Sequence, residues 1–357
     1  MLQNNNIILL AAGGTGGHVF PAIALAEACL RNGEKICCVT DPRAEKFFAQ
    51  VSADVNLKIL PLRSLQGGFI KRLKGIFYLW LSCFYALALL MKIRPKAVVG
   101  FGGYPSFPVL AAAWILNIPF FLHEQNAVLG RSNRYLVKNS KALLTTYAET
   151  KYANARKVIH VGTPVRLAIR ALATQAYPDD SRELRLLVVG GSQGANIFSE
   201  IVPQALALLP ENLRSRLFVV QQCSEAAQPA IKSLYVEKNI RNQLAAFFHD
   251  IPEQLSRAHL VITRAGASSL SEITMAARPA IMIPYPHAMD DHQTENAKSI
   301  VQAGGGIAIA QKDFTAENLA ELLNNLLSDH ERRKQMSQAL RNLAKPNAAQ
   351  EIIKAIS

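Results

Sequence analysis

The stretch IILLAAGGTGGH, residues 7–18, is the clearest structural signal in this 357-residue chain. Its first six residues form a short apolar run of the kind that is buried in parallel sheets. A glycine-rich turn follows, and residues 21–28 have the composition of a helix, with Pro21 in its first turn. An apolar strand, a glycine turn and a helix in succession open a doubly wound α/β domain.

The same design recurs further along the chain. Residues 184–189 form a second apolar run, GGSQGA follows at 190–195, and a helix is expected over about 197–209. Two such openings predict two α/β domains in tandem, and the Gly- and Pro-containing stretch 162–166 marks the break between them. Other strands are expected at 36–40, 97–100, 119–123, 142–145, 158–161, 217–221, 260–263 and 280–283.

Charge is divided unevenly between the two halves. The net charge is +13, and residues 1–166 hold 20 Lys and Arg against 7 Asp and Glu, whereas the remainder holds 19 of each. An excess confined to one half favours an anionic partner, either phospholipid or nucleic acid, over general solubility charge. The five cysteines make an odd count without ligand-like spacing, and Cys37 and Cys38 lie in an apolar run typical of packed thiols, which indicates a reducing cytoplasm. The first residues do not resemble a signal peptide.

Residues 76–91 are almost entirely apolar and are flanked by cations. A spanning helix needs about 20 apolar residues, so a buried domain helix is the simpler interpretation. The preceding stretch 65–74 mixes glycines, bulky apolar groups and cations, which is typical of a loop or short helix in a headgroup region. The side chains expected to contact a membrane are Phe69, Ile70, Lys71, Arg72, Leu73 and Lys74.

Polar residues cluster where predicted strands end, the edge at which α/β proteins bind ligands. His18 either orients and deprotonates a sugar hydroxyl or simply caps a helix. Glu124, in HEQN at 123–126, is a second candidate base or an orienting carboxylate. Ser192 and Gln193 in the second glycine loop suit phosphate.

Two further segments suit a nucleotide sugar. Glu272 falls near the start of a helix after the 260–263 strand, where a carboxylate accepts hydrogen bonds from ribose hydroxyls. Gln293, in a polar loop after the 280–283 strand, is placed to read sugar hydroxyls. The chain has no D-x-D and no ligand-like cluster, so we expect no metal and no cofactor. A helix dipole, Ser192 and a nearby Arg would then stabilise the leaving diphosphate.

Seven motifs in this order closely resemble the MurG family, the UDP-N-acetylglucosamine:undecaprenyl-diphospho-muramoylpentapeptide N-acetylglucosaminyltransferases of peptidoglycan synthesis. They are GGTGGH (13–18), GFGGYPS (100–106), HEQN (123–126), GTPVR (162–166), GGSQGA (190–195), RAGASSLSE (264–272) and the DDHQ loop (290–297). The resemblance covers about residues 7–300 and implies a GT-B fold, two Rossmann-like domains facing a deep cleft. It also implies an acceptor- and membrane-facing domain of residues 1–164, completed by a helix at about 344–357 that crosses back, and a UDP-sugar domain of residues 165–343.

The resemblance also implies roles for individual residues. His18 and Glu124 would be catalytic, with His18 favoured as the base in an inverting reaction on the acceptor's 4-hydroxyl. The acceptor would contact Gly14, Gly102, Gly103 and Tyr104. Phe248 would pair its main chain with the uracil, Asn126 and Gln293 would hold the sugar, and Arg166 and Ser192 the phosphates. The remaining donor-binding residues would be Thr15, Gly16, Gly17, Gln193, Ala267, Ser268, Ser269, Leu270, Ser271 and Glu272.

The expected partners are therefore UDP-N-acetylglucosamine, the undecaprenyl-diphosphate-linked muramoyl-pentapeptide and an anionic membrane surface, without nucleic acid. The expected location is the cytoplasmic face of the bacterial inner membrane, as a peripheral protein. Three alternatives stay open: a UDP-N-acetylglucosamine 2-epimerase of the same fold, a nucleic-acid-binding protein that uses the basic half, and an inactive membrane sensor of UDP-sugar. The epimerase has no use for a basic apolar face, and no recognisable nucleic-acid-binding motif is present.

Overall fold

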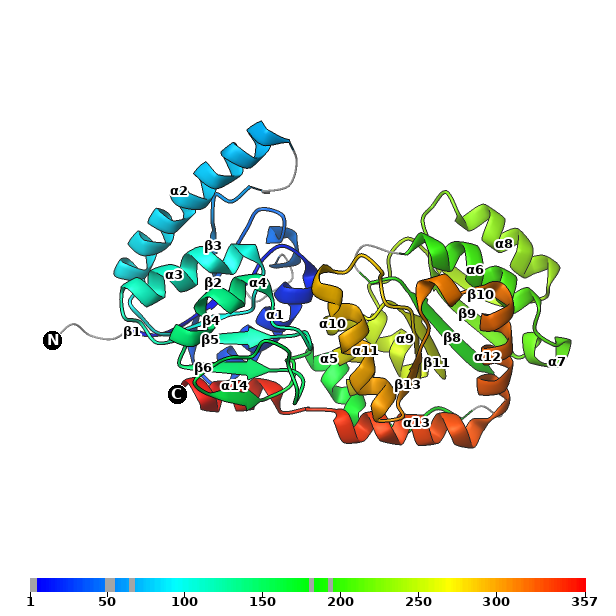
Figure 1. Ribbon diagram of the computed structural model, residues 1–357. Coiled ribbons are helices and arrows are strands. Elements are labelled where there is room, and N and C mark those ends of the chain that lie inside the picture. Colours follow the sequence, from blue (N-terminus) through cyan, green and yellow to red (C-terminus); the bar gives the residue numbers. More distant parts are fainter. Residues whose placement is uncertain (1–4, 49–54, 64–67, 180–182, 192–194) are drawn as a thin grey trace. The chain divides into compact units, whose positions relative to one another are not determined.

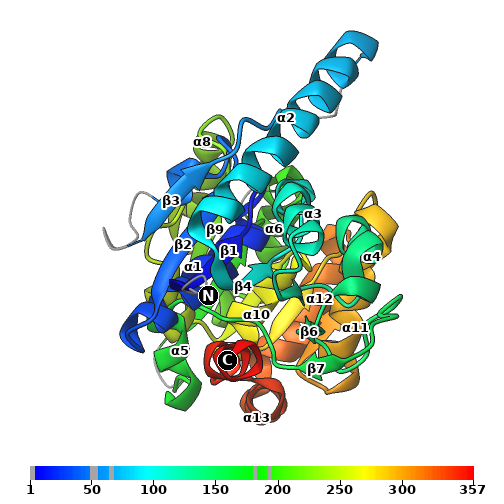
Figure 2. The same ribbon diagram turned by 90° about the vertical axis from the view of Figure 1, so that its left-hand side faces the viewer.

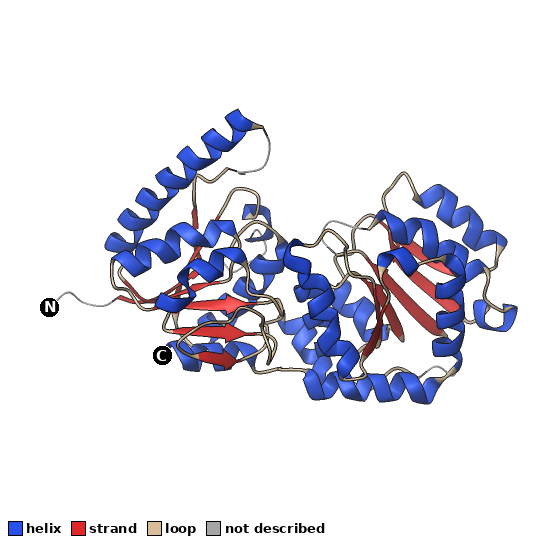
Figure 3. Ribbon diagram, viewed as in Figure 1, coloured by secondary structure: helices blue, strands red, loops and turns tan. Residues whose placement is uncertain are grey.

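The computed structural model describes residues 5–48, 55–63, 68–179, 183–191 and 195–357. The chain divides into two compact units: unit 1 is Met1–Arg166 with Lys345–Ser357, and unit 2 is Leu167–Ala344. Within the described ranges, each unit holds one sheet, of seven strands in unit 1 and six in unit 2, flanked by helices (Figures 1 and 3). The predicted fold class, two Rossmann-like α/β domains, is confirmed.

All strand pairs in unit 1 are parallel, in the order β3-β2-β1-β4-β5-β6-β7. The order reverses direction at the β1/β4 pair, because β2 and β3 lie on one side of β1 and β4 to β7 on the other. The strands are β1 (Asn5–Ala11), β2 (Lys35–Thr40), β3 (Asn56–Ile59), β4 (Pro95–Gly100), β5 (Phe120–Glu124), β6 (Ala142–Thr145) and β7 (Val158–His160).

Alternate side chains of these strands enter two apolar cores. Ile8 and Leu10 face a core shared with α1 and α14, and Leu9 and Ala11 face a core shared with α2 and α3. The C-terminal helix α14 thus closes one face of the first sheet, as Figure 1 shows. The helices of this unit are α1 (Gly16–Arg31), α2 (Phe69–Ile93), α3 (Phe107–Ile115), α4 (Arg131–Leu136) and α14 (Ala348–Ile356).

Unit 2 repeats this plan, with parallel strands in the order β10-β9-β8-β11-β12-β13. The strands are β8 (Leu184–Val189), β9 (Leu217–Gln222), β10 (Arg241–Ala245), β11 (Leu260–Thr263), β12 (Ala280–Met282) and β13 (Gly306–Ala308). The helices are α5 (Leu167–Arg170), α6 (Asn196–Ala207), α7 (Glu211–Arg214), α8 (Gln228–Glu237), α9 (Ile251–Arg257), α10 (Ala267–Met275), α11 (His292–Gln302), α12 (Ala316–Ser328) and α13 (His330–Leu343).

Helix α2 differs from both expectations for its region. It begins at Phe69, so residues 69–74 are its first turns and not a separate loop or short helix. It is also not buried, because one stripe that includes Ser82, Ala86 and Leu90 packs inward while Phe77, Trp80 and Phe84 are each more than 60% exposed. In Figures 1 and 2 its first half projects beyond α3 and the sheet of its own unit.

By length and composition, residues 71–93 of α2 would suffice to cross a membrane. The packing of the second half against α3, through the core that contains Ala86 and Leu90, is what a surface helix of an α/β unit shows. The side chains of Phe69 and Ile70 lie outside the described part of the structure, whereas Lys71, Arg72, Leu73 and Lys74 are exposed.

Cys37 and Cys38 are buried free thiols, as expected. All five are free, and four of them are buried. Burial raises the pKa of Cys29 to about 12 and that of Cys37 to about 11, so neither forms a thiolate near neutral pH.

Candidate active site

The position of each candidate site follows from the strand order. In parallel sheets of this kind, ligands bind beyond the carboxyl ends of the strands, at the point where the order reverses. In unit 1 the loops there follow β1, β4 and β5, and in unit 2 they follow β8, β11 and β12. These six loops carry the motifs GGTGGH, GFGGYPS, HEQN, GGSQGA, RAGASSLSE and DDHQ, so the topology brings three motifs together in each unit.

The first glycine loop is shaped by a carboxylate that no sequence motif marks. Asp41, which follows β2 and is 1% exposed, accepts a hydrogen bond from the Gly14 main-chain N–H at 2.8 Å and pairs with Arg43 at 2.6 Å. A Cβ on Gly13 would lie 2.7 Å from Oδ1 of Asp41, so no larger residue fits. The N–H of Gly14 is therefore committed to Asp41, and the contact of Gly14 with the acceptor stays a prediction.

His18 lies in the first turn of α1 and is partly exposed. Its Nδ1 is 2.9 Å from Oε1 of Gln125, and its ring lies against Gly102 and Gly103, which both have positive φ. A Cβ on Gly103 would lie 3.1 Å from Cδ2 of the ring. The glycines predicted to contact the acceptor thus also make room for the imidazole. No hydrogen bond joins Nε2 of His18 to another described residue.

Glu124, at the end of β5, is 2% exposed and its carboxylate is fully engaged. It accepts hydrogen bonds from the main-chain N–H groups of Asn126 (3.1 Å) and Gly130 (2.8 Å), and from the side-chain amides of Asn126 (3.1 Å) and Asn133 (2.9 Å). It therefore holds the HEQN turn in shape, and these contacts argue against its predicted role as a base or as the group that orients His18. The orienting contact comes from Gln125.

His123, on β5, is completely buried and donates from Nε2 to the carbonyl of Gly162 at 2.9 Å. Burial lowers the pKa of His123 to about 4, because a charged imidazolium would lose its hydration there. Its Nδ1 meets Nε2 of Gln125 at 2.8 Å. Together, His123 and Gln125 join His18 to the GTPVR segment.

Three other predicted residues of unit 1 have contacts of their own. Tyr104 donates its hydroxyl to the carbonyl of Arg63 at 2.7 Å, and burial raises its pKa. Thr15 precedes α1 and is exposed, and Arg166 lies over the ring of Phe20 at 5.7 Å. The roles assigned to Tyr104, Thr15, Gly16, Gly17, Asn126 and Arg166 in ligand binding stay predictions.

In unit 2, two amide side chains of α11 clamp the loop after β11. Oε1 of Gln293 accepts from the main-chain N–H groups of Ala265 (3.2 Å) and Tyr285 (2.9 Å), and the buried Asn296 donates to the carbonyl of Ala265 at 3.1 Å. With its oxygen held in this way, the amide nitrogen of Gln293 has no partner among the described residues and is oriented to donate. This geometry suits the predicted contact with a sugar hydroxyl.

Helix α10 carries the segment predicted to bind the nucleotide. Gly266 precedes it and makes no side-chain cap. Ala267, Ser268 and Ser269 form that first turn, and Glu272 is partly exposed one turn later. Leu270 is 1% exposed with its N–H bonded to Gly266, and Ser271 donates its hydroxyl to Ala267. Leu270 and Ser271 thus make contacts inside the unit, and their assignment to donor contacts stays a prediction.

Phe248, predicted to pair with uracil, has a buried side chain in the loop after β10. In the described part of the chain no hydrogen bond to the main chain of Phe248 occurs, and the contact with uracil stays a prediction. Ser192 and Gln193 lie outside the described residues.

Arg264 was not singled out from the sequence, although it opens the RAGASSLSE motif. It donates to the carbonyls of Ile283 (3.1 Å) and Pro284 (3.4 Å) and to Oε1 of Gln311 (2.7 Å). Its guanidinium also lies over the rings of Phe198 and Tyr285. A lone Arg directly after a buried strand was the available signal, and here it ties the loops after β11 and β12 together.

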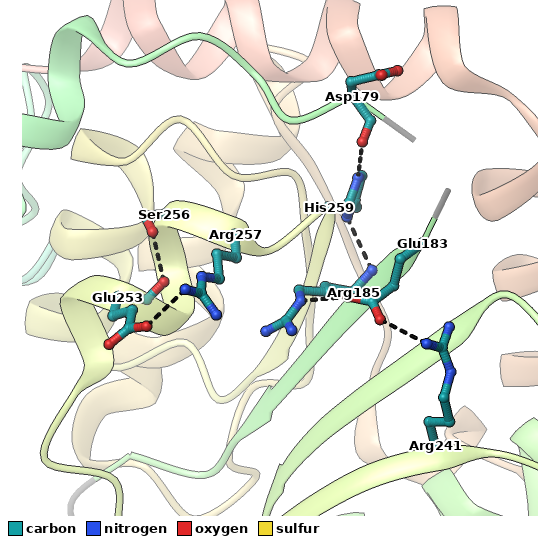
Figure 4. A network of polar contacts seen from close by, with 8 residues as sticks. All are labelled: Asp179, Glu183, Arg185, Arg241, Glu253, Ser256, Arg257 and His259. Atoms are coloured by element: carbon teal, nitrogen blue, oxygen red, sulfur yellow. Dashed lines mark hydrogen bonds and ion pairs between the residues drawn. The ribbon is translucent and has the colours of Figure 1, made fainter. Parts of the chain in front are cut away.

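A second polar network of unit 2 lies at the opposite edge of its sheet (Figure 4). His259, just before β11, accepts from the main-chain N–H of Arg185 at 2.9 Å and donates to the carbonyl of Asp179 at 3.2 Å. Glu183 pairs with Arg185 (2.7 Å) and Arg241 (3.1 Å). Because these residues lie at the amino ends of the strands, the network is structural. The described residues contain no group of three or more potential metal ligands.

Comparisons with known proteins agree with this geometry. The glycosyltransferase family 28 N-terminal domain matches residues 8–145, and the family 28 C-terminal domain matches residues 185–354. A UDP-N-acetylglucosamine--N-acetylmuramyl-(pentapeptide) pyrophosphoryl-undecaprenol N-acetylglucosamine transferase of Rhodospirillum centenum is 45% identical over 90% of this chain and 86% of its own. The transferase of that name from Wolbachia pipientis is 42% identical over 98% of both chains.

Among solved structures, MurG of Acinetobacter baumannii superposes with a TM-score of 0.80 and 29% identity, covering 98% of this chain and 99% of that one. The UDP-GlcNAc 2-epimerase of Neisseria meningitidis, bound to UDP-GlcNAc, has a TM-score of 0.69 over 98% and 99%, but only 15% identity. That second likeness shows a shared fold and nothing more.

Two Rossmann-like units, a histidine at the first switch point and the match of both domains define a glycosyltransferase of family 28 with the GT-B fold. Within that class, the near full-length identity to the curated transferases and the structural likeness are decisive. The chain belongs to the MurG family.

Proposed function

We propose that this chain transfers N-acetylglucosamine from UDP-N-acetylglucosamine to the 4-hydroxyl of undecaprenyl-diphospho-N-acetylmuramoyl-pentapeptide. The observation that carries this proposal is the 40–45% identity, over 90% or more of the chain, to transferases named for this reaction. The site geometry supports it, because a partly exposed imidazole whose Nε2 has no hydrogen-bond partner among the described residues is the kind of base that inverting transfer needs.

In this mechanism Nε2 of His18 takes the proton of the acceptor hydroxyl as its oxygen attacks the anomeric carbon. The bond from that carbon to the UDP oxygen breaks through an oxocarbenium-like state, and UDP leaves with the electron pair. Gln293 donates to a sugar hydroxyl, Glu272 accepts from the ribose, and Arg166 stabilises the diphosphate charge. Independence from divalent metal stays a prediction, which turnover in excess chelator tests.

The direct test is a coupled assay of UDP release with product analysis. Rapid UDP release that requires the muramoyl lipid, with formation of a disaccharide-pentapeptide lipid, is the expected result. Release of UDP without acceptor, together with a 2-epimerised N-acetylhexosamine, would instead favour the epimerase. Binding of UDP-N-acetylglucosamine without any product would favour the third alternative, an inactive sensor of UDP-sugar.

We further infer that helix α2 attaches the protein to the cytoplasmic face of the inner membrane. Ile76, Phe77, Trp80, Leu81, Phe84, Tyr85 and Met91 are all at least 41% exposed, and Lys71, Arg72 and Lys74 precede them on the same helix. Burying a large apolar side chain is worth about 1.5–3 kcal/mol, against about 1 kcal/mol for each cation near an anionic surface. The aromatic face therefore contributes more than the three cations, and salt should release the protein only in part.

Flotation with anionic vesicles tests this attachment. Replacement of Phe77, Trp80 and Phe84 by Ser should abolish binding, whereas charge reversal at Lys71, Arg72 and Lys74 should weaken it and increase its salt sensitivity. Both variants should raise the apparent KM for the lipid acceptor and leave activity on a short water-soluble acceptor near normal. Ser at the exposed Leu208 and Val236 of unit 2 is the matched control. Full vesicle binding by the triple aromatic variant would place the attachment elsewhere.

A further inference from the structure

An uninterrupted line of hydrogen bonds runs from the carbonyl of Gly162 to the ring of His18. Its members are His123, which bonds Gly162 at 2.9 Å, Gln125, which bonds His123 at 2.8 Å, and His18, which bonds Gln125 at 2.9 Å. His123 and Gln125 are 0% and 1% exposed, so water does not compete for these contacts. The line lies wholly within unit 1.

The donor and the acceptor of each hydrogen bond can be assigned by starting from the carbonyl of Gly162. A carbonyl oxygen only accepts, so Nε2 of His123 carries a hydrogen. Burial keeps His123 neutral, with a pKa of about 4, and a neutral imidazole has one N–H. Nδ1 of His123 is therefore a lone pair that requires a donor.

The amide of Gln125 supplies that donor. Its nitrogen faces Nδ1 of His123, and the same nitrogen lies 3.3 Å from the His123 carbonyl, a second group that only accepts. Both contacts fix the amide in one orientation, which turns its oxygen toward His18.

We propose that Gln125 and His123 are positioning residues that hold His18 in the tautomer with its hydrogen on Nδ1. The amide oxygen of Gln125 requires a donor at Nδ1, which leaves Nε2 of neutral His18 as a lone pair. The inference rests on the proposed function, because it assigns His18 the part of the base in glycosyl transfer. It reassigns to Gln125 the orienting part that sequence reasoning gave to Glu124.

The proton balance is simple. Nε2 takes the hydrogen of the acceptor hydroxyl while the new glycosidic bond forms and UDP departs with the electrons of the old one. His18 becomes an imidazolium whose Nδ1–H stays on Nδ1 and bonds Gln125 more strongly, since a charged donor makes the stronger bond. Neither Gln125 nor His123 gains or loses a proton.

Packing keeps the ring in place. Gly102 and Gly103 lie against Cε1 and Cδ2 of His18, within 3.1–3.6 Å of where their Cβ atoms would be. Turning the ring over would exchange Nδ1 for Cδ2 and break the bond to Gln125. Four titratable residues of the neighbouring loops and strands, Glu124, Asp41, Arg43 and Tyr104, make hydrogen bonds or ion pairs with residues other than His18.

The first test measures the tautomer directly in the whole protein. Long-range ¹H–¹⁵N correlation spectra of histidine-labelled protein, recorded with the imidazole of His18 neutral, should show a protonated Nδ1 and an unprotonated Nε2. Gln125→Leu should abolish that preference and lower kcat by about 10²-fold, with little change in donor KM, since a misoriented base loses most of its 10²–10⁴-fold contribution. A hydrogen on Nε2 of wild-type His18 would overturn the proposal even if every variant failed to fold.

The second test uses charge. Gln125→Glu keeps an acceptor for Nδ1–H and places a negative charge beside the ring, which raises the pKa of His18. The acid limb of the pH profile of kcat/KM should therefore move to higher pH, while the exposed Gln335→Glu on α13, a matched change of charge, should leave it in place. An unshifted limb in active Gln125→Glu would refute the positioning role.

These outcomes separate the inference from the proposed function. The tautomer is observed without substrate, so a protein that releases no UDP can still show it. Conversely, a protein that makes the expected disaccharide with His18 protonated on Nε2 retains the proposed function and loses this inference.

Discussion

Each unit contains a polar network centred on a buried histidine. The network of unit 1 leads to the candidate base, whereas that of unit 2 is structural. His123 in unit 1 joins side chains that lead outward to the partly exposed His18, at the carboxyl ends of the strands. His259 in unit 2 joins main-chain groups of Arg185 and Asp179, at the amino ends of the strands, and the ion pairs beside it run from Arg185 through Glu183 to Arg241. A reactive histidine is therefore distinguished from a structural one by whether it lies at the carboxyl or the amino ends of the strands, and not by the number of hydrogen bonds around it.

The largest effect should come from His18. His18→Asn should lower kcat by about 10²–10⁴-fold, because a positioned general base contributes that much, while thermal stability stays near wild type because the side chain is partly exposed. UDP-release kinetics and a melting curve measure the two quantities. His160→Asn, at a histidine outside the line to His18, is the control and should keep normal turnover.

Glu124→Gln completes that comparison. Its carboxylate serves four donors, so the substitution should loosen the turn after β5 and reduce stability more than chemistry. A loss of kcat equal to that of His18→Asn, in a variant of wild-type stability, would return the base role to Glu124.

The second largest effect concerns how the stability of unit 1 depends on pH. The pKa of His123 falls from an unfolded value near 6.5 to about 4 in the folded protein. The unfolded chain therefore binds more protons between these values, and stability is lost as pH falls through that window. The full difference corresponds to roughly 3 kcal/mol. Burial also lowers the pKa of His160, which adds to the slope in the same direction.

Tryptophan fluorescence isolates this unit, because both tryptophans of the chain, Trp80 and Trp114, belong to it. Urea midpoints should fall steadily from pH 7 to pH 4.5, and His123→Gln should flatten the curve. A wild-type midpoint that is constant over this range would mean that His123 is not held neutral.

Much of this architecture could be predicted from the sequence. The two runs at 7–18 and 184–195 predict both sheets, because an apolar strand followed by a glycine turn and a helix is typical of the first unit of a doubly wound α/β domain. The edge strands β3 (NLKI), β10 (RNQLA) and β13 (GIA) were missed, because they are short and lack a continuous apolar run. The exposure of α2 was missed because composition does not tell which face a neighbouring helix covers.

The candidate site divides in the same way. His18 and Gln293 could be found because each is a polar residue in a loop after a buried strand. Gln125 could not, because its importance depends on the carbonyl of Gly162, which is 37 positions away, and on the orientation of a single amide. The four donors to Glu124 could not be predicted, because they come from the turn and helix that follow it, and a carboxylate next to a strand end looks the same in the sequence whether it is free or engaged.

The third largest effect should come from removing His259 from the structural network of unit 2. His259→Leu leaves the main-chain N–H of Arg185 without its acceptor, and an unsatisfied buried donor costs about 1–3 kcal/mol. The unfolding transition of unit 2, followed by far-UV circular dichroism while tryptophan fluorescence tracks unit 1, should move to lower urea. Turnover at low temperature should be unchanged. A fall in kcat without loss of stability would show that the amino edge of this sheet takes part in function.

The smallest effect should come from the outer member of that network. Arg241 pairs with Glu183 at 3.1 Å but is 53% exposed, and Glu183 keeps its shorter contact with Arg185 when Arg241 is removed. Exposed ion pairs contribute about 0.2–1 kcal/mol, and salt screens them. Arg241→Gln should therefore shift the unit 2 transition by less than about 1 kcal/mol at low ionic strength and by less still in high salt. Glu183→Gln should cost more, since it removes both contacts at once. If Arg241→Gln instead lowered the stability of unit 2 as much as His259→Leu, the ion pairs and the hydrogen bonds of the network would be cooperative. The main-chain bonds of His259 would then not be its main stabilising contribution.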